Sequence, residues 1–223
     1  MVKFPLKSIL TWDILLVISV FLCAFVIPVF PPSWGQLPIR IGFTLIFISG
    51  FMTMEKRNWR IVYLMLAAFV MHWVSHILQW EFVADVSKFL NVLFFIIVIF
   101  SLIREMAIAK IVTPNVIMAS ISGYLLLGII YSVFIIAIMQ RDPGAFNITR
   151  EGNGIQDATA YYSKSMYFGF VTLATLGYGD ILPLKPYTRS LATLICISGQ
   201  LYIATIIGIL IGKFASGNAP ASK

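Results

Sequence analysis

The sequence predicts an all-α membrane protein in which six helices cross the bilayer and one shorter helix enters without crossing. Apolar residues make up 60% of the 223 residues and charged residues only 11%, far from the composition of soluble globular domains. The apolar residues gather in runs long enough to cross a hydrocarbon core of about 30 Å, separated by short polar or proline-containing segments. The length accommodates one membrane domain and is too short for a large soluble domain as well.

The basic residues are better explained as a membrane topology signal than as a nucleic-acid surface. The formal net charge is +7, but the lysines and arginines are scattered singly or in short clusters between apolar runs. Positive charges beside spans orient a membrane protein. Cys23 and Cys196 each lie within an apolar run, so we expect packing residues rather than a disulfide. The first apolar run is too long for a cleavable signal peptide and lacks a small-residue cleavage site.

Four apolar runs form the first predicted domain, residues 1–112. Pro31 and Pro32 end the first run, because proline lacks an amide donor and clashes with the preceding turn. The second run is short, but it is long enough to cross if its flanking side chains reach the headgroups. Acidic residues, Glu81 and Asp85, follow the third run. The four predicted spans cover residues 10–30, 39–54, 61–80 and 86–103.

The second predicted domain covers residues 113–214 and is followed by a short tail, residues 215–223. Thr113 can cap the fifth span, with Pro114 in its first turn. A polar stretch then predicts an extramembrane loop; its Asn147-Ile148-Thr149 triplet fits an N-glycosylation site that we expect to be unused. An apolar helix of about fifteen residues follows, too short to cross. The ranges are 113–139 for the fifth span, 140–159 for the loop, 160–174 for the short helix and 188–214 for the last span.

The run from Thr172 to Asp180, Thr-Leu-Ala-Thr-Leu-Gly-Tyr-Gly-Asp, is polar and rich in glycine between two apolar segments. Gly177 and Gly179 flank Tyr178, and glycines at alternate positions allow backbone angles closed to other residues. An extended segment whose residues alternate between left-handed and right-handed backbone angles can point successive carbonyls to the same side. Copies around an axis would then form rings of oxygens that replace the water shell of a monovalent cation.

These residues resemble the T-V-G-Y-G-D signature of the tetrameric potassium channel family, with Leu176 in place of valine. The resemblance extends over the preceding aromatic segment 167–171, which resembles a re-entrant pore helix, and over the apolar helix that follows the filter. It implies a selectivity filter that coordinates K⁺ through carbonyls and the Thr175 hydroxyl. The implied carbonyls are those of Thr175, Leu176, Gly177 and Tyr178.

The resemblance also implies a homotetramer, because one chain supplies one quarter of each oxygen ring. The expected partners are therefore three identical subunits and membrane lipids, with no nucleic acid; K⁺ is expected in the filter, and no organic cofactor is expected. Gly179, Asp180, Tyr167 and Phe168 are the expected filter supports, and the family geometry suggests that the Tyr167 hydroxyl bonds Asp180. Val171 stands where some relatives have a glutamate partner for that aspartate, so this carboxyl pair is absent.

Counting lysines and arginines in the short loops places both termini in the cytoplasm of a multi-pass cell-membrane protein. The two short outer loops then hold only Arg40 and Lys88, and the filter opens outward, as the resemblance requires. The basic residues expected inside are Lys3, Lys7, Lys56, Arg57, Arg60, Arg104, Lys110, Lys213 and Lys223.

Gating candidates lie on the last span. Gly199 is twenty positions after Gly179, where the resemblance places a hinge, but close helix packing explains a glycine there equally well. An apolar constriction could close the pore by dewetting. The fourth span has no lysine or arginine between residues 89 and 103, so we expect weak or no voltage dependence. The constriction candidates are Ile203, Ile206, Ile207 and Leu210.

His72 and His76 share one face of the third predicted span, four residues apart. Such a pair can bind a proton or zinc and modulate gating, whereas structural histidines bonded to a neighbouring span are the simpler interpretation. Three other functions are weighed against a potassium channel: a weakly selective cation channel, a potassium transporter and an intramembrane metal hydrolase. The chain has one filter repeat rather than four, and no third metal ligand at useful spacing.

Overall fold

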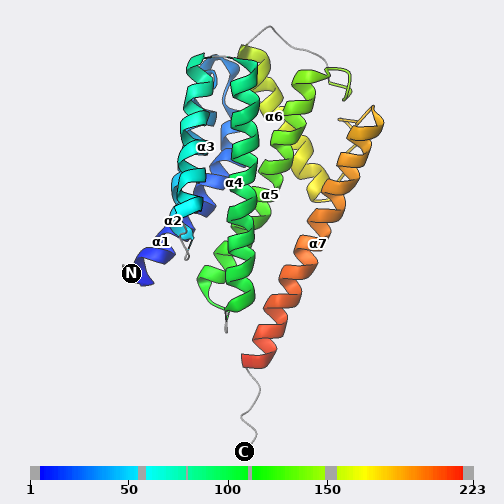
Figure 1. Ribbon diagram of the computed structural model, residues 1–223. Coiled ribbons are helices and arrows are strands. Elements are labelled where there is room, and N and C mark those ends of the chain that lie inside the picture. Colours follow the sequence, from blue (N-terminus) through cyan, green and yellow to red (C-terminus); the bar gives the residue numbers. More distant parts are fainter. Residues whose placement is uncertain (1–5, 55–58, 79, 110–111, 149–154, 218–223) are drawn as a thin grey trace, which may run out of the picture.

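The computed structural model describes residues 6–54, 59–78, 80–109, 112–148 and 155–217 of the chain. The helices lie side by side along one direction, except α6, which is tilted (Figure 1). The start of α1 and the end of α7 point to the same end of the molecule (Figure 1). The helices are α1 (Leu6–Phe21), α2 (Leu37–Thr53), α3 (Trp59–Leu78), α4 (Glu81–Ile108), α5 (Pro114–Arg141), α6 (Ile155–Leu173) and α7 (Pro186–Gly217).

Four helical stretches in the described part of the chain are long and apolar enough to cross a membrane. The all-α membrane fold predicted from composition therefore agrees with the structure. Two of the six predicted spans are shorter by this measure: α2 has 17 residues, and the apolar part of α3 is Val62–Ser75. The four long stretches are Trp12–Val29, Phe82–Ile108, Pro114–Arg141 and Pro186–Lys213.

The first span does not end as a plain α-helix. A π-helical turn, Leu22–Val26, and a 3₁₀ turn, Ile27–Val29, follow α1. Pro28 lies in the 3₁₀ turn, and its missing amide and its ring disrupt α-helical bonding to the preceding turn. Phe30, which precedes Pro31, is extended at φ −66° and ψ 138°, as steric contact with a following proline ring favours.

Several predictions about helix ends were wrong. Residues 155–159, expected in the loop after the fifth span, begin α6, which starts at Ile155. Asp85, expected in a loop after the third span, lies in the first turns of α4, which begins at Glu81. Gln140, expected to open a loop, is still helical, because α5 continues to Arg141. Thr113 occupies the position before α5, but its side chain makes no capping hydrogen bond. A predicted loop can be helical at its edges because polar side chains that reach water are compatible with either conformation.

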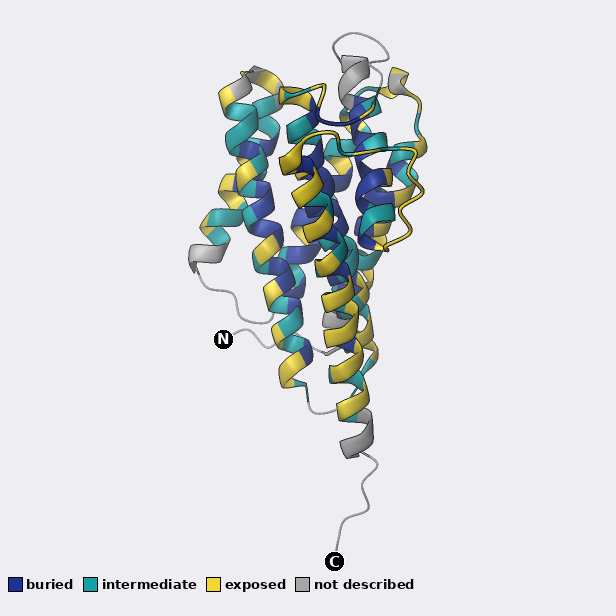
Figure 2. Ribbon diagram, turned by 90° about the vertical axis from the view of Figure 1, so that its right-hand side faces the viewer, coloured by how far each residue is buried: buried dark blue, intermediate teal, exposed yellow. Residues whose placement is uncertain are grey.

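The hydrophobic core joins the first four helices to α5. Helices α1 and α4 pack against α5, and α6 packs between α5 and α7. Helix α7 is by contrast largely exposed along its length (Figure 2). Helices α6 and α7 therefore contact the four-helix unit mainly through α5. The largest fully buried side chains of the core are Phe47, Phe94, Phe95, Leu16, Ile46, Leu102, Met106, Leu126 and Ile129.

Candidate functional site

The glycine-rich polar run that ends at Asp180 lies in the connection between α6 and α7. Helix α6 ends at Leu173, and residues 174–185 continue without regular helix to the start of α7 (Figure 1). Residues 174–180 are all exposed in the single chain, with Leu176 at 58% and Tyr178 at 67%. The segment thus lies open on one side of the molecule, next to α7 (Figure 2).

The backbone of this segment alternates in handedness, as expected from its glycines. Thr175, Gly177 and Gly179 have φ angles of 61°, 53° and 80°, whereas Leu176 and Tyr178 do not have positive φ. Left-handed angles at every second residue are the backbone condition for carbonyls that turn to one side. Thr175 adopts such an angle although it is β-branched, a conformation that costs energy.

The start of the segment is anchored to α6 and α7. Backbone amides of residues 174–176 donate to carbonyls in the last turn of α6 at 2.9–3.0 Å. The Gln200 Nε2 atom of α7 donates to the Thr175 hydroxyl at 3.4 Å. A Cβ atom on Gly199 would lie 2.2 Å from the Leu173 carbonyl oxygen, so α7 approaches the end of α6 as closely as glycine permits. The role of Gln200 was missed from the sequence, because nothing local links positions 25 residues apart.

The far end of the segment is bonded to α6, as the family geometry suggested. The Tyr167 hydroxyl donates to Asp180 Oδ2 at 2.6 Å, which confirms the expected hydrogen bond. The Ile181 amide donates to the other carboxylate oxygen at 3.0 Å. The Tyr167 hydrogen bond holds the pKa of Asp180 below its usual range. The bond therefore favours the ionised aspartate.

Removing this hydrogen bond gives a first prediction. The pKa of Asp180 is lower in the folded chain than in the unfolded chain. The ionised carboxylate therefore stabilises the folded chain fully above the ordinary aspartate pKa of about 3.9, and this stabilisation is lost as pH falls through the lower folded pKa. If residues 174–180 are the selectivity filter that the resemblance implies, ion flux is therefore constant between about pH 5 and 8 and falls only in stronger acid. Tyr167→Phe should then lower ion flux severalfold between about pH 5 and 8, measured in liposomes with the outer pH varied. A wild-type decline near neutral pH would contradict this assignment.

The loop after α5 contacts the C-terminal end of the segment, at Asp180 and Leu182. The Asn147 Nδ2 atom donates to the Asp180 carbonyl oxygen at 3.2 Å, and the Leu182 amide donates to Asn147 Oδ1 at 2.5 Å. Phe146 and Pro183 form an isolated antiparallel bridge. Asn147 was considered only as a glycosylation position, but its amide group is engaged by both partners. Sequence reasoning missed this contact because it joins residues 33 and 35 positions apart.

The two aromatic candidates of α6 play different parts. Phe168 is buried and packs edge-on against Phe146, with ring centroids 5.3 Å apart. Tyr167 is 39% exposed and points its hydroxyl to Asp180. One ring thus fixes α6 to the loop after α5, and the other supports the exposed segment directly.

The gating candidates on α7 separate into two groups. Helix α7 is continuous through Gly199, whose close contact with Leu173 supports the packing explanation. Ile206 is buried and Leu210 packs against the core, whereas Ile203 and Ile207 are 38% and 50% exposed. Ile203 and Ile207 are therefore open to contacts outside the single chain, whereas Ile206 and Leu210 already contact their own chain.

Within the part of the chain that the structure describes, His72 belongs to no cluster of metal ligands. His72 is buried beside Phe43 and Phe47, and its Nδ1 lies 3.4 Å from the Asn91 amide of α4. This supports the structural interpretation, a histidine bonded to a neighbouring span. The side chain of His76 lies outside the described residues. No group of three potential metal ligands occurs in the part of the chain that was searched, so the hydrolase interpretation gains no support.

Residues 123–216 match the family model described as ion channel. The match supports an ion channel. It covers the second half of α5, α6, the polar segment and α7, less than half of the chain, and it leaves the first four helices outside. Together with the apolar helices, it indicates a membrane transport protein rather than an enzyme. A search of curated proteins finds no match.

Two parts of the matched region are exposed in the single chain: the polar segment 174–180 and helix α7. In an apolar 18-residue part of Pro186–Lys213 only 17% of the residues are buried, against 50% in the corresponding part of Pro114–Arg141. Figure 2 shows this exposed face running the length of α7 next to the exposed segment. The large apolar side chains on it are Leu194, Ile197, Leu201, Ile203, Ile207 and Ile211.

Proposed function

We propose that the chain is one subunit of a homotetrameric potassium channel that conducts K⁺ passively through residues 175–178. The observation that carries this proposal is the alternation of left-handed φ angles at Thr175, Gly177 and Gly179 in an exposed segment at the end of α6. The carbonyls of Thr175, Leu176, Gly177 and Tyr178 and the Thr175 hydroxyl are the proposed K⁺ ligands. They replace the hydration shell of the ion.

The exposure of the segment supports a tetramer. Non-helical backbone at membrane depth is stable only when it is buried in protein or lines a water-filled path. In the single chain the filter residues and one side of α7 are uncovered. Three identical subunits around the filter axis would cover α7 and complete each oxygen ring. No bond is made or broken, and no organic cofactor is needed.

Conduction follows from ion dehydration offset by fixed dipoles. The carbonyl oxygens bind K⁺ tightly enough to select it. Repulsion between adjacent ions in single file then drives each ion to the next site, so that bound K⁺ is also released. The negative C-terminal end of α6 at Leu173 favours a cation below the filter. Tyr167, Asp180 and Gly179 hold the filter exit, while Phe168 holds α6. Ile203 and Ile207 are the exposed candidates for an apolar gate, and Gly199 and Leu210 adjust the packing of α7.

The first four helices complete a six-span subunit. Helices α2 and α3 lie alongside α1 and α4 (Figure 1), and 17 residues of helix extend about 26 Å, close to the thickness of a hydrocarbon core. Basic residues at the loops place both termini in the cytoplasm of a cell-membrane protein. The central part of α4 has no basic residue, so the channel is not strongly voltage-gated.

Ion flux into liposomes tests the function. The purified protein should pass K⁺ and exclude Na⁺, and external Ba²⁺ should block the K⁺ flux. The flux should vanish in liposomes that lack the protein. Equal K⁺ and Na⁺ flux would instead identify a weakly selective cation channel, and no flux of either ion at any pH or membrane tension would overturn the proposal.

A further inference from the structure

We propose that Asp85 and Arg141 are positioning residues of the filter, which tie its exit to the first four helices. This proposal rests on the proposed function for its effect on selectivity, but the contacts themselves do not depend on it. The connection runs in three steps: from α4 to the end of α5, along the loop that follows α5, and from that loop to the filter exit.

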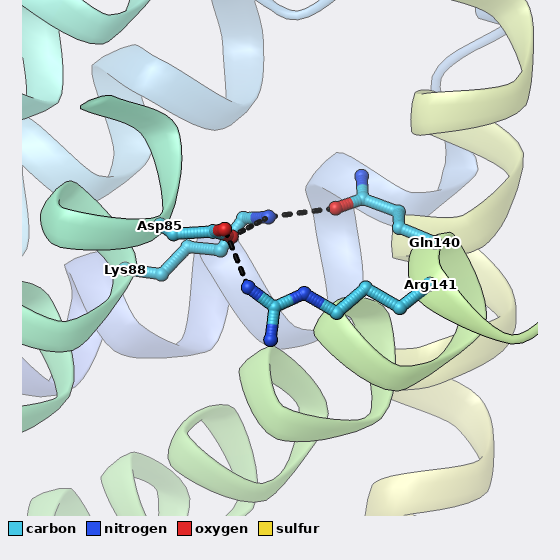
Figure 3. Close-up of polar contacts among 4 residues, drawn as sticks. All are labelled: Asp85, Lys88, Gln140 and Arg141. Carbon is cyan, nitrogen blue, oxygen red and sulfur yellow. Dashed lines mark hydrogen bonds and ion pairs between the residues drawn. The ribbon is translucent and has the colours of Figure 1, made fainter. Parts of the chain in front are cut away.

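The first step is the cluster drawn in Figure 3. Arg141 Nη2 donates to Asp85 Oδ2 at 2.5 Å, and Lys88 Nζ donates to Gln140 Oε1 at 2.8 Å. Lys88 also lies 3.4 Å from Asp85 Oδ1. Two side chains of α4 are thus hydrogen-bonded to the last two residues of α5 (Figure 3). Because the two bonds are side by side, they restrain both the position and the rotation of this helix end.

The second step is a stiff turn directly after α5. The Asp142 amide donates to the Ile138 carbonyl at 2.8 Å, which continues the helical bonding. The Asp142 carboxylate accepts the Gly144 amide at 3.1 Å and the Tyr187 hydroxyl of α7 at 2.6 Å. A short aspartate side chain that bonds its own turn restricts the backbone there. A displacement of Arg141 is therefore passed on to residues 145–147.

The third step joins this turn to the filter exit. The Leu184 amide donates to the Ala145 carbonyl at 2.9 Å, and the Asn147 amide donates to the Leu182 carbonyl at 3.1 Å. The Asn147 side chain bonds Asp180 and Leu182, as described above. The exit of the filter therefore has two supports, Tyr167 from α6 and this loop from α5. The loop is the support that reaches α4.

Hydrogen exchange tests the connection without requiring ion flux. The amides of Asn147, Leu182 and Leu184 make the bonds of the third step, so their exchange reports its opening. Exposed ion pairs are weak one at a time, and we expect Asp85→Ala or Arg141→Ala to raise exchange at these amides by about two- to fivefold. The amides of residues 174–176, which α6 anchors instead, should be unchanged.

Three further variants make the test specific. The double variant should equal Asp85→Ala, because that substitution already removes the Arg141 bond as well as the Lys88 ion pair, and Asp85→Glu should restore protection. Arg104→Ala removes a charge from the other end of α4 and should change nothing. If Asp85→Ala does not fold, Gln140→Ala weakens the same junction through its other bond and should give a smaller increase. Unchanged exchange in Arg141→Ala, or additive effects in the double variant, would overturn the proposal.

Flux measurements then connect the contact to selectivity. In liposomes, Asp85→Ala and Arg141→Ala should lower the ratio of K⁺ to Na⁺ flux, and Asp85→Glu and Arg104→Ala should not. If the wild-type protein passes no K⁺, the proposed function fails while the exchange result stands. If the wild-type protein is selective and the Arg141→Ala ratio is unchanged, the positioning role fails while the proposed function stands.

Discussion

Gly177→Ala is expected to reduce K⁺ flux by at least about tenfold while the protein still folds. Gly177 has a φ of 53°, and an L side chain in this left-handed region costs roughly 1–2 kcal/mol. The filter can relieve the strain by rotating the peptide, which would turn one carbonyl away from the ion path. A tetramer would repeat this defect in every subunit, so a small cost per chain removes a whole ring of oxygen ligands.

Gly35→Ala is the matched control for that result. Gly35 also has a left-handed φ, 65°, and a Cβ at either glycine would meet no atom within 4 Å. Both substitutions therefore impose similar backbone strain without a clash, but Gly35 lies in the loop before α2, far from the filter in sequence. Flux per folded protein should be normal in Gly35→Ala. Equal loss in both variants would mean that strain alone, and not filter geometry, stops conduction.

Gly199→Ala is expected to destabilise the contact between α7 and α6. The added Cβ would lie 2.2 Å from the Leu173 carbonyl oxygen and 3.0 Å from a Leu173 methyl group. A backbone oxygen at the end of a helix cannot move aside as a flexible side chain can. Overpacking typically costs about 1–3 kcal/mol, partly offset by about 1 kcal/mol of helix propensity. We expect a lower unfolding temperature and reduced flux, measured by thermal unfolding and in liposomes.

Gly208→Ala is the control on the same helix. A Cβ at Gly208 meets nothing within 4 Å in the chain, so helix propensity alone should leave stability equal or slightly higher. The pair also separates the two explanations of Gly199. A hinge predicts that Gly199→Ala is stable and alters only opening, whereas close packing predicts that stability and flux fall together.

Much of the channel domain could be predicted from the sequence because its signals are local. Glycines at alternate positions predicted the alternating backbone of residues 175–179, since only their freedom at positive φ allows it. Pro114 at the start of α5 and the long apolar runs predicted the helices. The Tyr167–Asp180 bond followed from a resemblance in a contiguous stretch. The first four helices were located to within several residues for the same reason, the length of their apolar runs.

The tertiary structure alone decided which distant residues support the filter. Asn147, Gln200 and the pair Asp85–Arg141 bond partners 25 to 56 positions away, and no periodicity or motif encodes such pairings. Apolar helices in lipid carry little directional pattern, so the packing of α1 and α4 on α5 had no signal either. The sequence determined the local backbone chemistry, through glycine, proline and apolar length. The path of the chain in space determined which polar groups meet, because a hydrogen bond depends on positions that only the assembled fold sets.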